Sequence, residues 1–431
     1  MHAIDRKLIR DFRRLWAQAL AIALVLACGV AIVLISFGMY RALDETRTAY
    51  YERNRFADLF ATVRRAPMGL MQEISAIAGV QAVDMRVSGT VIVDVPGLSE
   101  AAVGHILSLP EAEDPALNAP MLLSGTLPQT ASEIAVNRPF ALANGLGTGD
   151  VIEANLNGRK RALTISGTVL SPEFIYTIGP GALMPDDLRY GVLWMGRETL
   201  QAAYDLDGAF NEVSASLLRG ANPERVVDEM DRLLDRYGSH GAYVRADQAS
   251  NWFLTNEIDQ LETMARFLPT VFLAVAAFLT NMVVARLVAV ERPEIGLLKA
   301  FGYANTAIAW HYVKLVLAIG AVGTLLGWFF GYWLGLYSTT MYADFYRFPF
   351  LLFRPSAGPF LLAAGASVSA ALLGAIGAVR RAAALSPAAA MQPPAPPLFQ
   401  RNRLFLSRLL ERLDQPTRIV FGSCRVCAPH K

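Results

Sequence analysis

Long apolar runs dominate the pattern along this chain of 431 residues. A helix needs about 20 apolar residues to cross a bilayer. Four stretches without charge reach that length: 15–40, 267–285, 315–337 and 355–379. The first is longer than the apolar region of a signal peptide, and no clear small-x-small cleavage site follows it. We therefore predict a membrane α-helical protein with four transmembrane helices.

The connections between these spans differ in charge. Residues 1–14 contain five lysines and arginines, 286–314 contain four and 380–431 contain nine, whereas 338–354 contain two. The positive-inside rule then places both termini and the 286–314 loop in the cytoplasm. Residues 41–266 lie outside and carry 30 acidic against 19 basic residues. The basic inner face suits the anionic headgroups of a lipid bilayer, and no nucleic acid partner is expected.

Helical patterns also flank the spans. Residues 1–14 are predicted to form a cytoplasmic amphipathic helix, with apolar and basic residues on opposite faces. The first span continues without a turn signal into 41–55, and 251–266 keep helical spacing before the second span. These segments predict stiff stalks that carry the outer domain. Residues 380–431 are interpreted as a cytoplasmic Pro-rich linker and basic tail.

The outer segment combines strand and helix patterns. Residues 56–95 and 212–246 each contain a strand–helix–strand pattern, and the region between them is rich in glycine and in strand candidates. Asn157-Gly158 is typical of a type I′ hairpin turn. We predict a large extracytoplasmic α+β domain, inserted between the first and second transmembrane helices. It is expected to consist of two split βαβ halves with a β-rich insertion.

Glycines recur at every fourth position of the third span. They are Gly323, Gly327, Gly331 and Gly335, and this spacing places them on one helix face. Small residues in register let a second helix approach closely, which is how spans associate in lipid. The fourth span, rich in alanine and glycine, is the expected partner.

Residues 291–303, inside the cytoplasmic 286–314 loop, have the marks of a compact helix with defined ends. Pro293 suits a first helical position. Glu294 in the first turn and Lys299 in the last match the helix dipole. Gly302 can adopt the left-handed conformation that ends many helices.

This predicted helix is amphipathic as well as short. Ile295, Leu298 and Phe301 follow one another at three-residue spacing and are expected to share one face. A short amphipathic helix held between two spans is not an independent domain. We interpret the 286–314 segment as a coupling loop, a lever on which another component acts.

Signatures of catalysis are absent from the sequence. It contains no G-x-x-x-x-G-K-[ST] phosphate loop, no H-E-x-x-H and no G-x-S-x-G. Cys424 and Cys427, with His430 nearby, supply three of the four ligands that a structural zinc site needs, so no metal site is predicted. His105 and His240 are isolated in the outer segment. We predict a protein that is not an enzyme, with no catalytic residues and no cofactor of its own.

The order of one span, a large outer domain and three further spans resembles the FtsX-like permease family. The most specific match is the stretch 292–302, which is similar to the cytoplasmic loop motif of that family, and the outer segment resembles a MacB-like periplasmic core domain. The resemblance implies an ABC transporter permease in the bacterial inner (plasma) membrane, exporting or extracting a lipid, lipoprotein, peptide or drug.

The resemblance also implies partners and site residues. A separate cytoplasmic ABC ATPase uses the ATP, the permease pairs as a homo- or heterodimer, and a periplasmic adaptor is a further expected partner. The residues expected to couple to the ATPase are Glu291, Glu294, Ile295, Leu298, Lys299, Phe301 and Gly302. Two alternatives stay open. One is a transmembrane signalling scaffold that activates a periplasmic cell-wall hydrolase, and the other is an inactive truncated half of a larger permease.

Overall fold

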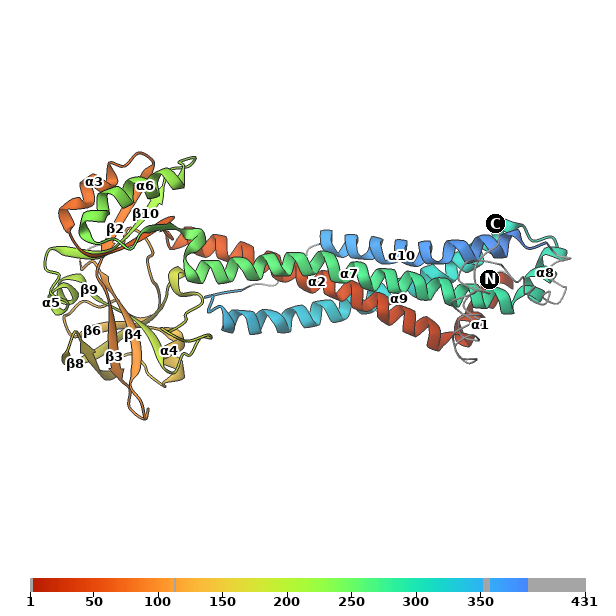
Figure 1. The fold of residues 1–431 in the computed structure, drawn as a ribbon. Coiled ribbons are helices and arrows are strands. Elements are labelled where there is room, and N and C mark those ends of the chain that lie inside the picture. Colours follow the sequence, from red (N-terminus) through yellow and green to blue (C-terminus); the bar gives the residue numbers. More distant parts are fainter. Residues whose placement is uncertain (1–2, 112–113, 352–356, 387–431) are drawn as a thin grey trace, which may run out of the picture. The chain divides into compact units, whose positions relative to one another are not determined.

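The computed structural model describes residues 3–111, 114–351 and 357–386 (Figure 1). It consists of two compact units. One is built from Met1–Arg14, Phe278–Val316 and Leu372–Lys431, and the other from Leu15–Ala277 and Leu317–Ala371. The predicted Pro-rich linker and the Cys424 and Cys427 pair lie outside the described residues.

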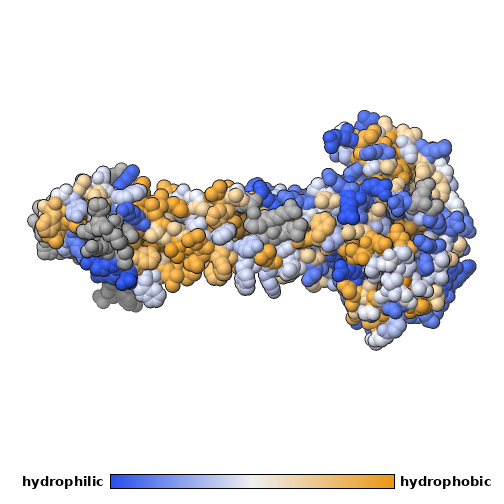
Figure 2. Space-filling model, turned by 180° about the vertical axis from the view of Figure 1, so that it is seen from behind, coloured by the Kyte–Doolittle hydropathy of each residue, from blue (hydrophilic) through white to orange (hydrophobic). Residues whose placement is uncertain are grey.

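Within the described residues, four helices are long and apolar enough to cross a membrane. They are α2 (Trp16–Arg53), α7 (Ala249–Val290), α9 (Asn305–Phe345) and α10 (Ala357–Ala384). Apolar side chains cover much of the surface of these helices (Figure 2). The short α1 (Ala3–Arg14) precedes them, and a large domain of strands and short helices lies between α2 and α7 in the chain. This arrangement confirms the predicted fold class, a four-helix membrane protein with an inserted α+β domain.

The first lobe of the inserted domain is a four-stranded antiparallel sheet in the order β11-β1-β10-β2. Its strands are β1 (Leu59–Pro67), β2 (Val80–Arg86), β10 (Ala209–Leu217) and β11 (Ala242–Val244). Helices α3 (Met71–Ser75) and α6 (Pro223–Leu234) bury Ile74, Val226 and Met230 against the sheet. Strands from both predicted halves alternate in this sheet, so the two halves form one lobe.

The second lobe contains seven strands in the order β5-β8-β6-β9-β4-β3-β7. They are β3 (Ser88–Asp94), β4 (Ala102–Leu109), β5 (Met121–Gly125), β6 (Glu133–Asn137), β7 (Val151–Leu156), β8 (Arg159–Leu170) and β9 (Tyr190–Gly196). Because β7 also pairs with β8, the sheet closes into a barrel and leaves few free edges. Helices α4 (Arg138–Ala143) and α5 (Arg197–Ala203) pack on it.

The hairpin between β7 and β8 turns as predicted. Asn157 and Gly158 have φ angles of 48° and 82°, the two positive values that a type I′ turn requires.

A buried charge cluster joins the two lobes. The guanidinium of Arg86 on β2 donates to both carboxylate oxygens of Glu173, at 2.6 and 2.5 Å, and its Nε donates to Glu212 on β10 at 3.1 Å. Burial alone would lower the pKa of Arg86, but the two carboxylates raise it well above its ordinary value. Burial also raises the pKa of Glu212, yet Arg86 outweighs it and holds that pKa below its usual range.

The glycines of α9 pack against α2, and the expectation that α10 is their partner is wrong. A Cβ added at Gly323 would lie 2.8 Å from the carbonyl oxygen of Ala23, and one added at Gly327 would lie 2.7 Å from that of Ala27. At Gly331 it would lie 3.0 Å from the Cα of Ala31. Backbones therefore approach at successive turns of both helices, because only hydrogen occupies the space between them.

Gly335, the fourth predicted glycine, and helix α10 make the remaining contacts of α9 described here. Gly335 is buried, and its carbonyl accepts a hydrogen bond from the Thr339 hydroxyl at 2.8 Å. Helix α10 approaches α9 on another side, where Val368 lies near Gly320 and the hydroxyl groups of Thr324 and Ser367 are 3.4 Å apart.

Candidate coupling site around helix α8

Helix α8 (Arg292–Ala300) occupies the position of the predicted lever between α7 and α9. Pro293 lies in its first turn, where the missing N–H has no intrahelical partner. Gly302 has a φ of 89°, and its N–H donates to the carbonyl of Lys299 while that of Tyr303 donates to Leu298. This pair of bonds is a Schellman motif, which satisfies carbonyls at the helix end. The predicted helix ends are therefore present.

Glu291, directly before α8, is the centre of a buried polar network. Its Oε2 accepts from the Lys7 ammonium at 2.9 Å and from the Tyr312 hydroxyl at 2.9 Å. Its other oxygen is buried without a hydrogen-bond partner among the described residues. The network joins α1, the start of α8 and the start of α9, so Glu291 holds three elements together and is not exposed to a partner protein.

Asp11 extends this network along α1. Its carboxylate accepts from Lys7 at 2.9 Å and lies 3.1 Å from Nε2 of His311. Burial alone would raise the pKa of Asp11, but the hydrogen bonds with His311 and Lys7 outweigh it and lower that pKa. Burial would likewise lower the pKa of Lys7, but Glu291 and Asp11 together raise it. Opposite charges at these distances favour the ionised form of each group.

The two charged residues within α8 have different environments. The half-exposed carboxylate of Glu294 lies 3.1 Å from the Lys7 ammonium and 3.4 Å from the Arg10 guanidinium. The Lys299 ammonium donates to the carbonyl of Ala383 at 2.7 Å and to that of Leu385. Burial lowers the pKa of Lys299. Lys299 thus caps the C-terminal end of α10, where carbonyl groups lack helical partners.

The predicted apolar face of α8 is split in two. Ile295 is 1% exposed, whereas Phe301 is 75% exposed and Leu298 is intermediate. The expectation of one shared face is wrong for geometric reasons. At about 100° per residue, positions six apart differ by about 120° around the helix, and Phe301 already lies past the last helical residue. Ile295 therefore packs inside the chain, and Phe301 faces outward.

An exposed apolar patch remains on α8 and the turn after it. It consists of Leu297, which is 48% exposed, together with Phe301 and Tyr303. We call these three residues the α8 patch. Leu297 and Tyr303 were not among the residues expected from the sequence. The spacing of Leu297 and Phe301, four residues apart, is the signal that would have found Leu297.

The residues that hold Glu291 were also missed by sequence reasoning. Lys7 is 284 residues away from Glu291. It belongs to the predicted amphipathic helix 1–14, whose basic residues indicate only contact with the membrane surface. Tyr312 lies at the end of the predicted 286–314 loop, just before the third span, and no sequence motif singles it out. No local pattern indicates these contacts, because they depend on how three separate helices pack.

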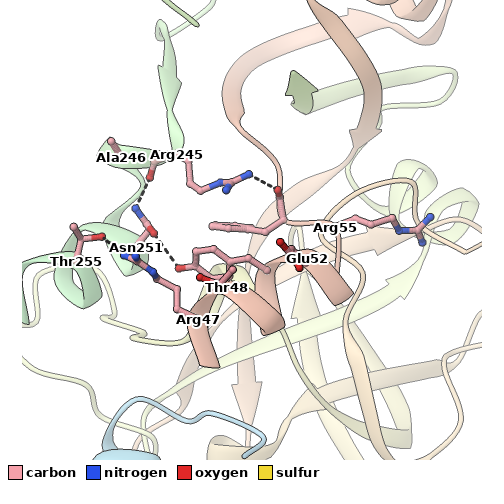
Figure 3. A pocket seen from close by; sticks show the side chains of 10 residues that line it. Arg47, Thr48, Glu52, Arg55, Arg245, Ala246, Asn251 and Thr255 are labelled. Atoms are coloured by element: carbon pink, nitrogen blue, oxygen red, sulfur yellow. Dashed lines mark hydrogen bonds between the residues drawn. The ribbon is translucent and has the colours of Figure 1, made fainter. Parts of the chain in front are cut away.

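A second candidate site is a pocket of about 520 Å³ between the stalks and the first lobe (Figure 3). Arg245 and Arg47 line it, but their guanidinium groups are already engaged. Arg245 donates to the carbonyls of Phe56 and Ala57, and Arg47 pairs with Asp44 at 2.6 Å. Arg47 also donates to the hydroxyl of Thr255 at 3.3 Å, which joins α2 to α7, while the Arg245 bonds hold the segment that enters the first lobe. The arginines of this pocket therefore hold parts of the chain together and are not free to bind a ligand.

Metal-ligating clusters of three or more His, Cys, Asp or Glu side chains are absent from the part of the chain that the structure describes. His105 lies on β4 against the ring of Phe174, with centroids 5.9 Å apart. His240 donates its backbone N–H to the carbonyl of Thr62. The two histidines thus lie in different lobes.

Comparison with known proteins adds a family and a set of similar structures. Residues 266–387 match the family model described as FtsX-like permease C-terminal, which confirms the predicted resemblance. No curated protein matches the chain. One similar solved structure is the extracellular domain of the noncanonical ABC-type transporter YknZ from Gram-positive bacteria. It has 11% identity and a TM-score of 0.29, over 44% of this chain and 98% of that one.

Two further solved structures are also similar to part of the chain. The periplasmic region of MacB from Actinobacillus actinomycetemcomitans has 11% identity and a TM-score of 0.30, over 48% of this chain and 95% of that one. A domain of a permease protein from Porphyromonas gingivalis has 13% identity and a TM-score of 0.28, over 44% of this chain and 89% of that one.

Proposed function

We propose that this chain, a membrane protein with an FtsX-like permease C-terminal domain over residues 266–387, is the permease subunit of an ABC transporter. A separate cytoplasmic ATPase binds helix α8, and its ATP-driven movement is passed to the outer lobes, which export or extract a substrate. The protein lies in the bacterial inner membrane with both termini in the cytoplasm, and it works as a dimer with a second permease chain.

The observation that carries this proposal is the two-sided construction of α8. One side is held by the buried Glu291 network and by Ile295, while the other exposes the α8 patch. Anchors in protein interfaces are typically aromatic side chains at the centre of an apolar patch. Phe301 and Tyr303 meet that description, and Phe301 lies in the stretch 292–302, which has the most specific resemblance to the family.

The Glu291 network holds α8 rigidly against its neighbouring helices. A force on Phe301 can move neighbouring elements only if α8 moves with them as one body. Lys7 and Tyr312 tie the start of α8 to α1 and α9, and Lys299 ties its end to α10. We therefore assign Glu291 and Lys299 a positioning role and reserve direct ATPase contact for the α8 patch and Glu294.

The absence of a phosphate loop from the sequence supports an external source of energy. The uncharged predicted spans agree with this, because an ion-driven transporter needs ionisable groups within the membrane. The ATPase is therefore the partner on which the activity depends.

A photo-cross-linking experiment tests the docking site in the native host. A benzophenone amino acid replaces Phe301, and the same probe replaces Phe278, a residue of α7 that is equally apolar and 66% exposed. We expect ultraviolet light to link position 301, but not position 278, to a protein with a Walker A motif. Phe301→Ala should reduce co-purification of that ATPase by about thirtyfold or more, the effect of an interface hot spot of about 2 kcal/mol.

Two results would overturn the assignment. One is equal cross-linking at both positions, and the other is undiminished ATPase recovery with Phe301→Ala in a chain that is expressed and folded normally.

A further inference from the structure

An open pocket of about 470 Å³ lies beside the α7 stalk, outside the predicted span. Five of the eight residues that line it are aromatic, and these five come from three parts of the chain. Trp252 and Phe253 belong to α7. Phe345 is the last residue of α9 and Tyr346 follows it, while Tyr176 lies in the loop after β8. Sequence reasoning did not single out any of these residues.

The rings form a connected cage. The Tyr176 centroid lies 4.7 Å from that of Phe253, 5.3 Å from that of Phe345 and 5.9 Å from that of Tyr346. Trp252 stands edge-on to Phe253 at 5.0 Å. Offset and tilted contacts at these distances are the favourable aromatic geometry, so the cage is preorganised.

One carboxylate lies in the wall of this cage. Glu257 lines the pocket, and its Oε1 accepts from the Tyr342 hydroxyl at 2.6 Å. Among the residues that the structure describes, no lysine or arginine forms an ion pair with Glu257. Its negative charge is thus oriented by a neutral donor and not cancelled by a cation of the chain.

The exposure of the rings argues against a purely structural cluster. Tyr346 is buried in the core between the stalks, but Trp252 is 51% exposed and Phe345 is 46% exposed. Large apolar side chains that only fill a core are buried. Here two of the rings that line the pocket remain about half exposed.

We propose that this cage binds an organic cation, a substituted ammonium group attached to an apolar body. Aromatic faces attract cations through their quadrupole, and a nearby carboxylate adds charge attraction. The apolar body would contact the exposed rings of Trp252 and Phe345. This proposal goes beyond the transporter function and does not depend on it, because binding needs neither ATP nor the ATPase.

The distance of the cage from the bilayer limits which molecules can supply the ligand. Glu257 precedes the predicted span at 267 by ten residues, which is about 15 Å of helix. The headgroup layer is only about 5–8 Å thick on each side of the bilayer. A lipid in an undisturbed leaflet therefore stays below the cage. The ligand is either a free amphiphilic cation or the amine headgroup of a lipid lifted out of the membrane.

Binding is measured by calorimetry on the full chain in maltoside micelles, with benzyltrimethylammonium as the probe. Neopentylbenzene, in which carbon replaces the nitrogen, is the matched neutral ligand. We expect binding of the cation and at least tenfold weaker binding of the neutral compound. Glu257→Gln should weaken cation binding by about tenfold or more, and Phe345→Ala by about two- to thirtyfold. Asp259→Asn, an exposed carboxylate on the same stalk, should leave affinity unchanged.

Competition then separates the two sources. Displacement of the probe by dihexanoyl phosphatidylethanolamine, but not by dihexanoyl phosphatidylglycerol, identifies a lipid amine headgroup. Displacement by neither identifies a free organic cation. Equal binding of the neutral compound, or full affinity in Glu257→Gln and Phe345→Ala chains with unchanged thermal unfolding, would overturn the proposal. An equal loss in Asp259→Asn would do the same, because it would reveal attraction to the stalk surface in general.

Discussion

Gly327→Ala is the sharpest test of the packing between α9 and α2. The new Cβ would lie 2.6 Å from the Cβ of Val30 and 2.7 Å from the carbonyl oxygen of Ala27, where ordinary contacts are 3.4–4 Å. One of these atoms belongs to the backbone and cannot rotate away. The helices must therefore separate by roughly 0.7 Å locally, which weakens the contacts on either side.

The loss of stability caused by the clash is obtained by comparing Gly327→Ala with a second glycine-to-alanine substitution in a membrane helix. Overpacking in a tight core typically costs about 1–3 kcal/mol. Replacing glycine by alanine in a helix also contributes about 1 kcal/mol of stability through the backbone. Gly365→Ala in α10 provides the matched control, because nothing lies within 4 Å of a Cβ there. The backbone contribution cancels between the two variants, so Gly327→Ala should be less stable than Gly365→Ala by about 1–3 kcal/mol.

Equilibrium unfolding of the full chain in mixed micelles, titrated with sodium dodecyl sulfate and followed by circular dichroism, measures this difference. The closer contacts at Gly327 and Gly323 than at Gly331 predict a smaller cost for Gly331→Ala. Equal stability of Gly327→Ala and Gly365→Ala would refute the close approach of α9 to α2.

Three further predictions concern the charge clusters and the end of α8. Arg86→Met should destabilise the outer lobes by about 3–5 kcal/mol in urea unfolding, because two buried carboxylates lose their counter-charge, and adding Glu173→Gln should recover part of that loss. The pKa of Asp11 is lower in the folded state than its ordinary 3.8, so its contribution to stability is present above that pH and is lost as the pH falls further. Asp11→Asn should therefore reduce the loss of thermal stability between pH 5 and about pH 2, and an unchanged acid limb would contradict this assignment. Gly302→Ala should cost about 1–2 kcal/mol because its φ is left-handed, and Gly302→Asn, which tolerates that conformation, should cost less in the same thermal assay.

Local features of this protein could be predicted because they depend on neighbouring residues alone. Charge-free runs of sufficient length indicate spans wherever they occur, since an unpaired charge in lipid is costly. The Asn157-Gly158 turn and the left-handed Gly302 follow from backbone conformations that few other residues adopt. The strand pattern on both sides of the inserted region also predicted an α+β domain.

Long-range packing decided the rest. The sequence predicts that the glycines of α9 meet a helix, but only the tertiary structure identifies α2 as that helix, because either neighbouring span offers small residues. From the sequence, Glu291 is predicted to be an exposed coupling residue. In the structure it is bound by Lys7, which is 284 residues away. The outward position of Phe301 depends on where α8 ends and on what covers Ile295. Spacing determines which residues share a helix face, whereas the partner of each face is set by the packing of distant segments.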